Sequence, residues 1–135
     1  METKNKILVV DDDLAILKFT CVSLSLAGYE VFTTTDGKEA IKLVDSKKPD
    51  VMVLDLVMFP MLGFEVLESV RCFSEVPVIV FSARSDFAAK ALKEGANEFI
   101  AKPFRPEQLI QKIQDILALT KPACKLPFNA FSSVL

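Results

Sequence analysis

Five polar residues stand directly after short apolar runs, and their types are suited to phosphate chemistry. Asp11, Asp12 and Asp13 follow one such run, Asp55 ends a second, and Lys102 follows a third. Carboxylates at the mouth of an apolar strand cost free energy unless a cation or hydrogen bonds compensate them. A cluster of carboxylates therefore predicts a hard metal ion, which takes oxygen ligands, and the lysine predicts an anion beside it.

The composition indicates one domain with a real core. The chain has 135 residues, of which 51% are hydrophobic and 25% charged, with a formal net charge of -2. This near-neutral balance argues against a nucleic-acid partner. Because no apolar run reaches the roughly 18 residues of a membrane span, and the first six residues lead straight into a strand, we expect a cytoplasmic protein without a membrane partner.

Histidine is absent, which excludes histidine-based catalysis and zinc sites built on histidine. The cysteines are Cys21, Cys72 and Cys124, an odd number without the spacing of a metal site. We expect them to be small buried thiols.

Short strands separated by stretches of helical length predict βαβ units and a mostly parallel sheet. We expect strands at 6–10, 30–34, 51–55, 78–81 and 98–101, and helices at 13–27, 36–46, 63–72, 85–94 and 106–119. Asp13 is expected to cap the first helix, and Gly28 to end it. The run 36–39 has the spacing of a capping box, and Ser85 or Asp86 is expected to cap the fourth helix.

The apolar pattern also predicts the order of the strands. The first, third and fourth runs are continuously apolar, as central strands covered on both faces should be, whereas the second and fifth are mixed. Right-handed crossovers then fit the order 2-1-3-4-5. This is an α/β fold, a three-layer α/β/α sandwich with a doubly wound, flavodoxin-like (βα)5 sheet. Its ligand site lies where strands one and three end, which is where the aspartates stand.

Over residues 4 to about 119 the chain resembles the receiver domain of two-component response regulators. The matching pieces are Ile7-Leu8-Val9-Val10-Asp11-Asp12, Val53-Leu54-Asp55, Val80-Phe81-Ser82-Ala83 and Lys102-Pro103-Phe104. The resemblance implies a stand-alone signalling domain, not an enzyme. It would take a phosphoryl group from a phosphohistidine of a sensor kinase or phosphotransfer protein and then act on a downstream protein. Residues 1–119 would be the receiver, and 120–135 a tail that is a linker, disordered or docked.

The resemblance also implies a role for each residue of the acidic site. Asp55 matches the phosphoacceptor, Asp12 the direct Mg²⁺ ligand, and Asp11 the ligand that acts largely through water. The main-chain carbonyl of Val57 would complete the protein's share of the Mg²⁺ shell. Mg²⁺ prefers such a set, with few carboxylates beside water and phosphate.

Four further residues match the phosphate-binding and switch positions of receivers. Lys102 would contact one phosphoryl oxygen, and the Ser82 hydroxyl, next to Ala83, would donate a hydrogen bond to another. Phe99 stands at the aromatic switch position. The expected mechanism is a population shift, in which phosphorylation draws Ser82 inward and Phe99 fills the vacated space.

Two segments depart from the receiver pattern. Receivers usually have proline four residues after the acceptor, where this chain has Phe59, followed by Pro60. The loop at 56–63 is unusually apolar, and its exposed residues would either contact a partner or fold onto the third helix. The span from Ser82 to Lys102 is about two residues shorter than is common, so we expect a clipped or shifted fourth helix.

The first helix is apolar on several faces. Between Leu14 and Tyr29 the only charged residue is Lys18. A helix of this kind implies a second burial partner. The resemblance favours the sensor kinase, with Leu14, Leu17 and Phe59 as interface residues, and leaves a homodimer as the alternative. The chain would then be a monomer or a weak homodimer.

Other classes on the same architecture fit less well. A flavin-binding flavodoxin needs a Ser/Thr/Gly-rich phosphate loop where this chain has three aspartates. A dehalogenase-type phosphatase needs a second acid two residues after the nucleophile, where this chain has Val57. The remaining alternative is a receiver-like adaptor that binds partners without being phosphorylated.

Overall fold

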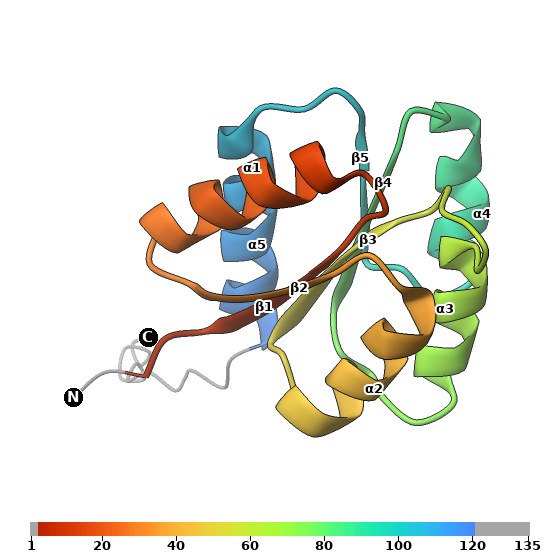
Figure 1. Ribbon diagram of the computed structural model, residues 1–135, viewed down its shortest axis with the longest axis horizontal. Helices are drawn as coiled ribbons and strands as arrows, with labels where there is room; N and C mark the ends of the chain where they lie inside the picture. Colours follow the sequence, from red (N-terminus) through yellow and green to blue (C-terminus); the bar gives the residue numbers. More distant parts are fainter. Residues whose placement is uncertain (1–2, 121–135) are drawn as a thin grey trace, which may run out of the picture.

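The computed structural model describes residues 3–120, and Figure 1 shows how their elements are arranged. The strands are β1 (Lys6–Val10), β2 (Glu30–Thr34), β3 (Val51–Asp55), β4 (Val78–Ser82) and β5 (Glu98–Ala101). The helices are α1 (Leu14–Leu26), α2 (Gly37–Lys47), α3 (Gly63–Arg71), α4 (Ala88–Lys93) and α5 (Pro106–Thr120), with a 3₁₀ turn, η1 (Ser85–Phe87), before α4. These bounds agree with the predicted elements to within a residue or two, except around α4.

The strands form one parallel sheet in the order β2-β1-β3-β4-β5, which confirms the predicted topology. Every residue of β3 and β4 is buried, whereas β2 and β5, at the two edges, are partly exposed. The continuity of the apolar runs therefore separated central from edge strands correctly, because a central parallel strand is covered on both faces.

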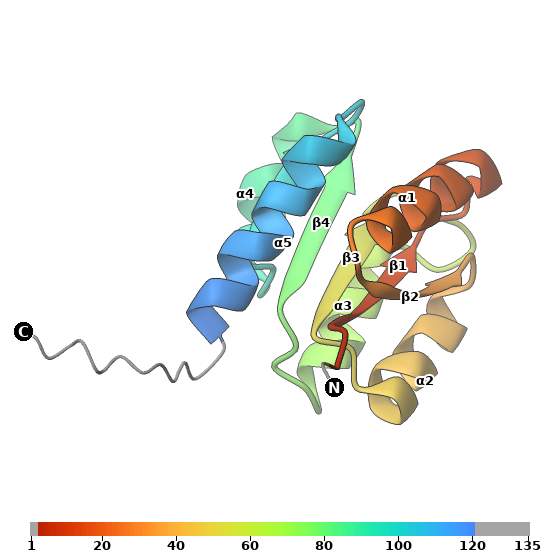
Figure 2. The same cartoon turned by 90° about the vertical axis from the view of Figure 1, so that its left-hand side faces the viewer.

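Helices cover both faces of the sheet. Helices α1 and α5 lie on one face, and α2, α3 and α4 lie on the other (Figures 1 and 2). Because side chains alternate along a strand, β1 supplies both cores. Leu8 and Val10 join the cluster under α2, α3 and α4, and Ile7 and Val9 join the cluster under α1 and α5.

The predicted cap of α1 is confirmed, whereas the predicted capping box at the start of α2 is only partly formed. Asp13 caps α1 as expected, since its Oδ1 accepts hydrogen bonds from the first-turn backbone at 3.0 and 3.3 Å. Asp36 also caps α2, by accepting from Lys38 N. The predicted capping box is incomplete, however, because the Glu39 carboxylate accepts from the Thr34 hydroxyl instead of turning back to the cap.

The segment after β4 is short, as the sequence predicted. A single 3₁₀ turn leads into an α4 of only 6 residues. The predicted cap is wrong, because neither Ser85 nor Asp86 makes a side-chain cap. Asp86 instead pairs with Arg84, with the guanidinium Nη2 2.8 Å from Oδ2, so its carboxylate is already engaged.

The expectation of buried cysteines is wrong for the two that the structure describes. Cys72 is exposed and Cys21 is only half-buried. Cys72 follows the last residue of α3, beyond the part of that helix that packs on the sheet. Cys124 and residues 121–135 of the predicted tail lie outside the described residues, and the predicted boundary at 119 stays a prediction. Within residues 3–120, no helix combines the length and apolarity needed to cross a membrane.

Candidate metal and phosphate site

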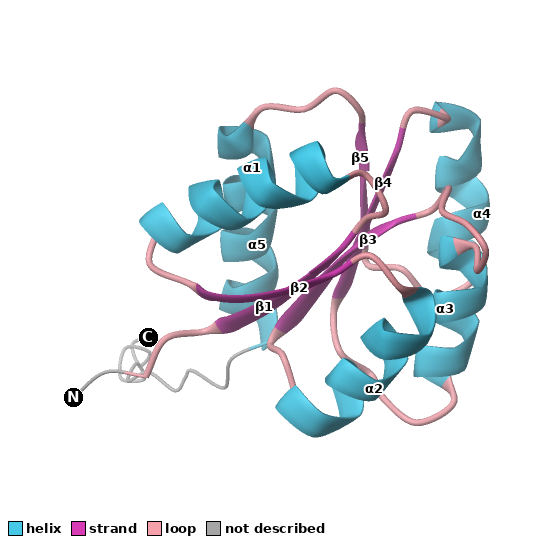
Figure 3. Ribbon diagram, in the orientation of Figure 1, coloured by secondary structure: helices cyan, strands magenta, loops and turns pink. Residues whose placement is uncertain are grey.

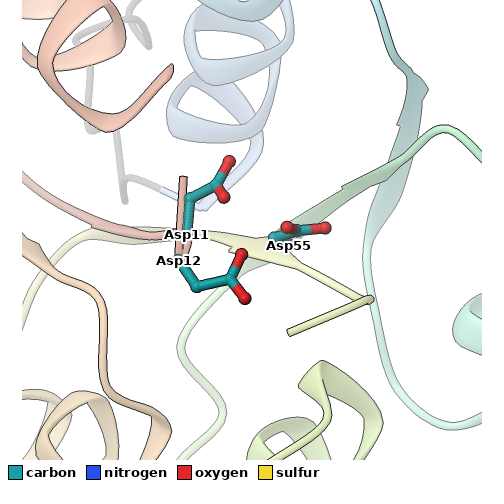
Figure 4. A group of neighbouring side chains, drawn as sticks. All are labelled: Asp11, Asp12 and Asp55. Carbon is teal, nitrogen blue, oxygen red and sulfur yellow. The ribbon is translucent and has the colours of Figure 1, made fainter. Parts of the chain in front are cut away.

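The carboxyl ends of the strands bring the predicted acidic residues together. Asp11 and Asp12 directly follow β1, and Asp55 is the last residue of β3, its neighbour in the sheet (Figures 3 and 4). One carboxylate oxygen from each of the three lies within 4.8 Å of the others. Residues more than 40 positions apart in the chain therefore form one acidic cluster, as the strand order predicted.

Lys102, directly after β5, brings its ammonium to this cluster. Its Nζ lies 3.2 Å from Asp11 Oδ2 and 3.3 Å from Asp55 Oδ2. Asp11 and Asp55 are 0% and 4% exposed, and the Lys102 side chain is 18% exposed, while Asp12 faces solvent. One ammonium group therefore contacts two buried carboxylates, and the third carboxylate of the cluster is exposed to solvent.

Main-chain N–H groups hold the three carboxylates in place. Asp13 N donates to Asp11 Oδ1 at 2.9 Å, and Val57 N donates to Asp55 Oδ1 at 3.1 Å. In the β3–α3 loop, Phe59 N donates to Asp12 Oδ2 at 3.3 Å. Sequence reasoning missed these donors, and nothing in the side chains signals them, because every residue except proline carries the same N–H.

The donor set fits a hard divalent cation. All three groups are carboxylates, which suit Mg²⁺ or Ca²⁺, and the described part of the chain adds one ammonium to them. The negative charge left in a largely buried site favours a bound cation. The cluster of Asp11, Asp12 and Asp55 could therefore hold such an ion.

The environment of Asp55 raises its pKa to about 6. Burial is the main cause, and the neighbouring charge of Asp11 adds to it, while Lys102 and the Val57 N–H act in the opposite direction. Even so, most Asp55 side chains are ionised at neutral pH. The carboxylate is nevertheless more basic than an exposed one.

This shift predicts a pH-dependent stability in the metal-free protein. The folded state holds a proton on Asp55 up to a pH of about 6, whereas the unfolded chain releases it near 3.8. The free energy of unfolding should therefore fall as pH rises between these values and then level off. Asp55→Asn removes the effect, so it should stabilise the protein at pH 7 by on the order of 2 kcal/mol.

The measurement is urea unfolding in EDTA at a series of pH values, for wild type and Asp55→Asn. The difference between the two proteins isolates Asp55 from the other carboxylates that titrate in the same range. It should be small near the unfolded-state pKa and reach its full size above about pH 6. A difference that does not change with pH would contradict the assigned cause.

The predicted phosphate-binding and switch residues lie on the neighbouring strands. Ser82 ends β4 and is buried, with its Oγ accepting from Arg84 N at 3.0 Å, and Ala83 beside it is exposed. Phe99, in β5, is half-buried and packs against the core cluster under α2, α3 and α4. Ser82 thus stands at the same carboxyl end of the sheet as Asp55. Phe99 lies in β5, the strand next to β4.

The predicted partner residues divide into exposed and buried ones. Leu14 and Phe59 are each 71% exposed, so both are available to a partner. Leu17 is only 7% exposed, and including it in an interface is wrong, because it packs in the core between α1 and the sheet. In the apolar loop after Asp55, Met61 packs against the core while Leu62 is exposed, so the loop both folds inward and presents apolar side chains.

Comparisons with known proteins agree with this geometry. The model of the response regulator receiver domain matches residues 7–114. A probable transcriptional regulator, ycf27, from Guillardia theta is 39% identical, over 100% of this chain and 52% of that protein. The response regulator MprA of Mycobacterium avium is 38% identical, over 87% of this chain and 53% of its own length. The chain thus spans about half the length of these relatives.

Solved structures show the same fold. The receiver domain of the Francisella response regulator 1452 superposes with a TM-score of 0.83 at 31% identity, covering 87% of this chain and 100% of that one. The chemotaxis protein CheY4 of Vibrio cholerae gives a TM-score of 0.80 at 32% identity, covering 85% of this chain and 100% of that one. The agreement extends over the whole sheet and its helices.

Proposed function

Because the chain belongs to the response-regulator receiver family, which acts in two-component signalling, we propose that Asp55 accepts a phosphoryl group from a phosphohistidine. The donor would be a sensor kinase or a phosphotransfer protein in the cytoplasm, and the recipient of the signal a downstream protein. Receiver domains are signalling domains and are generally not classed as enzymes. The observation that carries the proposal is the contact of Lys102 with Asp11 and Asp55 beside Asp12.

The proposed transfer is a displacement at phosphorus. A carboxylate oxygen of Asp55 forms the new P–O bond, the P–N bond to the donor imidazole breaks, and its electron pair stays on the ring nitrogen. The raised pKa of Asp55, to about 6, supports this role, since the group is ionised near neutral pH and is more nucleophilic than an ordinary aspartate. The Val57 N–H and the Lys102 ammonium hold its two oxygens in a fixed orientation.

In this proposal Asp11, Asp12, Asp55 and the main-chain carbonyl of Val57 hold Mg²⁺. The ion would supply positive charge that offsets the charge on the phosphoryl oxygens during transfer. The chain's own contribution is positioning, because phosphoryl transfer depends mainly on alignment and charge neutralisation.

After transfer, Lys102 and Ser82 would hold the phosphoryl group. The Lys102 ammonium is already at the Asp55 carboxylate, and the Ser82 hydroxyl, whose oxygen accepts from Arg84 N, has its own proton available to donate. Drawing Ser82 toward the phosphoryl group would change the packing at the end of β4. Phe99, which lacks a hydroxyl, would respond through packing alone, which is the population shift proposed for the switch.

We propose that the phosphodonor docks at the rim of the acidic site. Leu14 and Phe59 expose 71% of their surface, and Phe59 follows Asp55 closely in the chain. An apolar hollow of about 250 Å³ lies beside Lys102, and Phe104 is among the residues that line it. Apolar side chains around a charged site exclude water from the reacting groups when a partner covers them.

The test is incubation with acetyl phosphate and Mg²⁺, read by intact mass. Wild type should gain one phosphoryl group only when Mg²⁺ is present, and Asp55→Asn should gain none. Asp45→Asn is the matched control, since Asp45 is an exposed aspartate of α2, and it should behave like wild type. Phosphorylation of Asp55→Asn at the wild-type level would contradict the assignment of the acceptor.

A receiver-like adaptor that is never phosphorylated is the alternative, and it is not favoured. The four residues that the chemistry needs are all present. The carboxylates of Asp11, Asp12 and Asp55 lie together, and Lys102 contacts two of them, Asp11 and Asp55. If neither acetyl phosphate nor a phosphorylated kinase transferred a phosphoryl group to wild type, the adaptor would replace the present proposal.

A further inference from the structure

Phe81 lies between the strand that carries Asp55 and the strand that leads to Lys102. Within the sheet it is in register with Asp55 of β3 on one side and with Ile100 of β5 on the other. Side chains in register on neighbouring parallel strands point to the same face, and Phe81 and Ile100 both pack in the core cluster under α1 and α5. The Phe81 ring therefore stands next to the place where Asp55 and Lys102 meet.

The Lys102 ammonium lies over this ring. Its Nζ is 4.8 Å from the centre of the Phe81 ring, within the roughly 6 Å at which the negative face of an aromatic ring attracts a cation. The same Nζ lies 3.2 Å from Asp11 Oδ2 and 3.3 Å from Asp55 Oδ2. The ammonium therefore has three attractive neighbours, of which two are carboxylates and the third is the ring.

The core and a second ring hold Phe81 in place. Phe81 is only 1% exposed, so its side chain is surrounded by other atoms on nearly every side. It also meets Phe104 edge to face, with the ring centres 5.5 Å apart and the ring planes 64° apart. This is a favoured geometry for two aromatic rings. The position of the Phe81 ring under the ammonium is therefore a fixed feature of the fold.

We propose that Phe81 is a positioning residue, whose ring face holds the Lys102 ammonium between Asp11 and Asp55. A lysine ammonium ends a flexible four-carbon stem, so keeping it in one place costs side-chain entropy. Hydrogen bonds to the carboxylates fix the ammonium only while those oxygens accept. The attraction of the ring face needs no acceptor lone pair, so it stays the same when the hydrogen-bond partners of the ammonium change.

This contact has a consequence for phosphoryl transfer, which rests on the proposed function. Once an oxygen of Asp55 is bonded to phosphorus, the Lys102 ammonium has a phosphoryl oxygen as its new partner. Phe81 has no side-chain donor or acceptor, so its contact with the ammonium is unaltered by this exchange. Because phosphoryl transfer depends on positioned charge, a ring that attracts the ammonium less strongly should slow the transfer.

A second lysine over a ring provides a matched control. Lys47 Nζ lies 5.5 Å from the centre of the Phe32 ring, in β2. Phe32 is also partly buried, and it packs against the core cluster on the opposite face of the sheet. Neither residue of this pair belongs to the acidic site. Weakening the Phe32 ring should therefore reproduce the chemical change at Phe81 without an effect on Lys102.

The test replaces Phe81 of the full chain by 4-fluoro-, 3,5-difluoro- and 3,4,5-trifluorophenylalanine. Fluorine withdraws electrons from the ring face and hardly changes the shape of the ring, so the attraction falls in steps while the packing is kept. In urea unfolding with EDTA at pH 7, the unfolding equilibrium constant should rise in the same steps, reaching roughly three- to tenfold for the trifluoro ring. In the Lys102→Met background the series should have no effect, because no cation faces the ring.

The rate of phosphorylation by acetyl phosphate with Mg²⁺, read by intact mass, is the second measurement. The rate should fall along the Phe81 series, by roughly three- to tenfold for the trifluoro ring. The same three residues placed at Phe32 should leave the rate at the wild-type value. Because the ring shape is kept throughout, a residue that only fills space in the core would give no such series.

Three results would overturn the proposal. The unfolding constant could stay level along the Phe81 series, or change equally in Lys102→Met, and either result would make Phe81 a core residue only. The rate could stay level while the unfolding constant follows the series, or fall equally in the Phe32 series, and the ring would then not position the reacting lysine. If wild type took no phosphoryl group, the proposed function would fail, and the unfolding series would still decide whether the ring holds Lys102.

Discussion

Replacing Gly63 with alanine should lower the free energy of unfolding by about 3 kcal/mol or more and misplace the Asp55 carboxylate. Gly63 opens α3 and lies against the end of β3, where its N–H donates to Leu56 O at 3.0 Å. An added Cβ would stand 2.6 Å from Leu56 Cα and closer still to the Asp55 carbonyl oxygen. Both obstacles are backbone, so a change of rotamer gives no relief, and the strand end that carries Asp55 must move.

Urea unfolding and phosphorylation by acetyl phosphate together measure this effect. Gly37→Ala is the matched control, because the nearest atom to its added Cβ is Val66 Cγ2 at 2.8 Å, followed by atoms of the Met61 side chain. These are side-chain atoms that can shift, so the loss of stability should be clearly smaller and phosphorylation should continue. Equal losses in the two variants would show that the close approach at Gly63 is not what fixes the loop.

Replacing Lys102 with methionine should lower the free energy of unfolding by about 3 kcal/mol at pH 7 without Mg²⁺. The change keeps most of the apolar stem but removes the ammonium that contacts Asp11 and Asp55 at 3.2 and 3.3 Å. Two buried carboxylates then remain without a cation, and this penalty exceeds the net value of the ion pair itself. Urea unfolding in EDTA measures the loss.

Two companion variants separate this cause from others. Lys112→Met breaks an ion pair with Glu98 in which both side chains are 40% exposed, and it should cost less than about 1 kcal/mol. Adding Asp55→Asn to Lys102→Met should restore much of the stability, because only one buried carboxylate then lacks a partner. If the double variant were no more stable than Lys102→Met alone, uncompensated charge would not be the reason for the loss.

The order of the strands and the acidic site were predictable because both depend on local patterns. Continuous apolar runs distinguish central from edge strands, and right-handed crossovers then leave one suitable order, which the sheet confirms. Once the order is known, residues at the carboxyl ends of neighbouring strands must converge. That is why Asp11, Asp12, Asp55 and Lys102 could be placed together before any contact between them was known.

Two kinds of feature were decided only by the tertiary structure. One is the orientation of side chains in a segment whose pattern is uniform, and the other is contacts made by the main chain. Because α1 is apolar on most sides, its pattern could not show that Leu17 faces the core while Phe19 faces solvent. The pairing of Asp86 with Arg84 displaced a cap that the sequence allowed equally well. The N–H groups that orient the carboxylates, and the backbone that closes around Gly63, are fixed by the folded path of the chain, since their chemistry is the same at almost every residue.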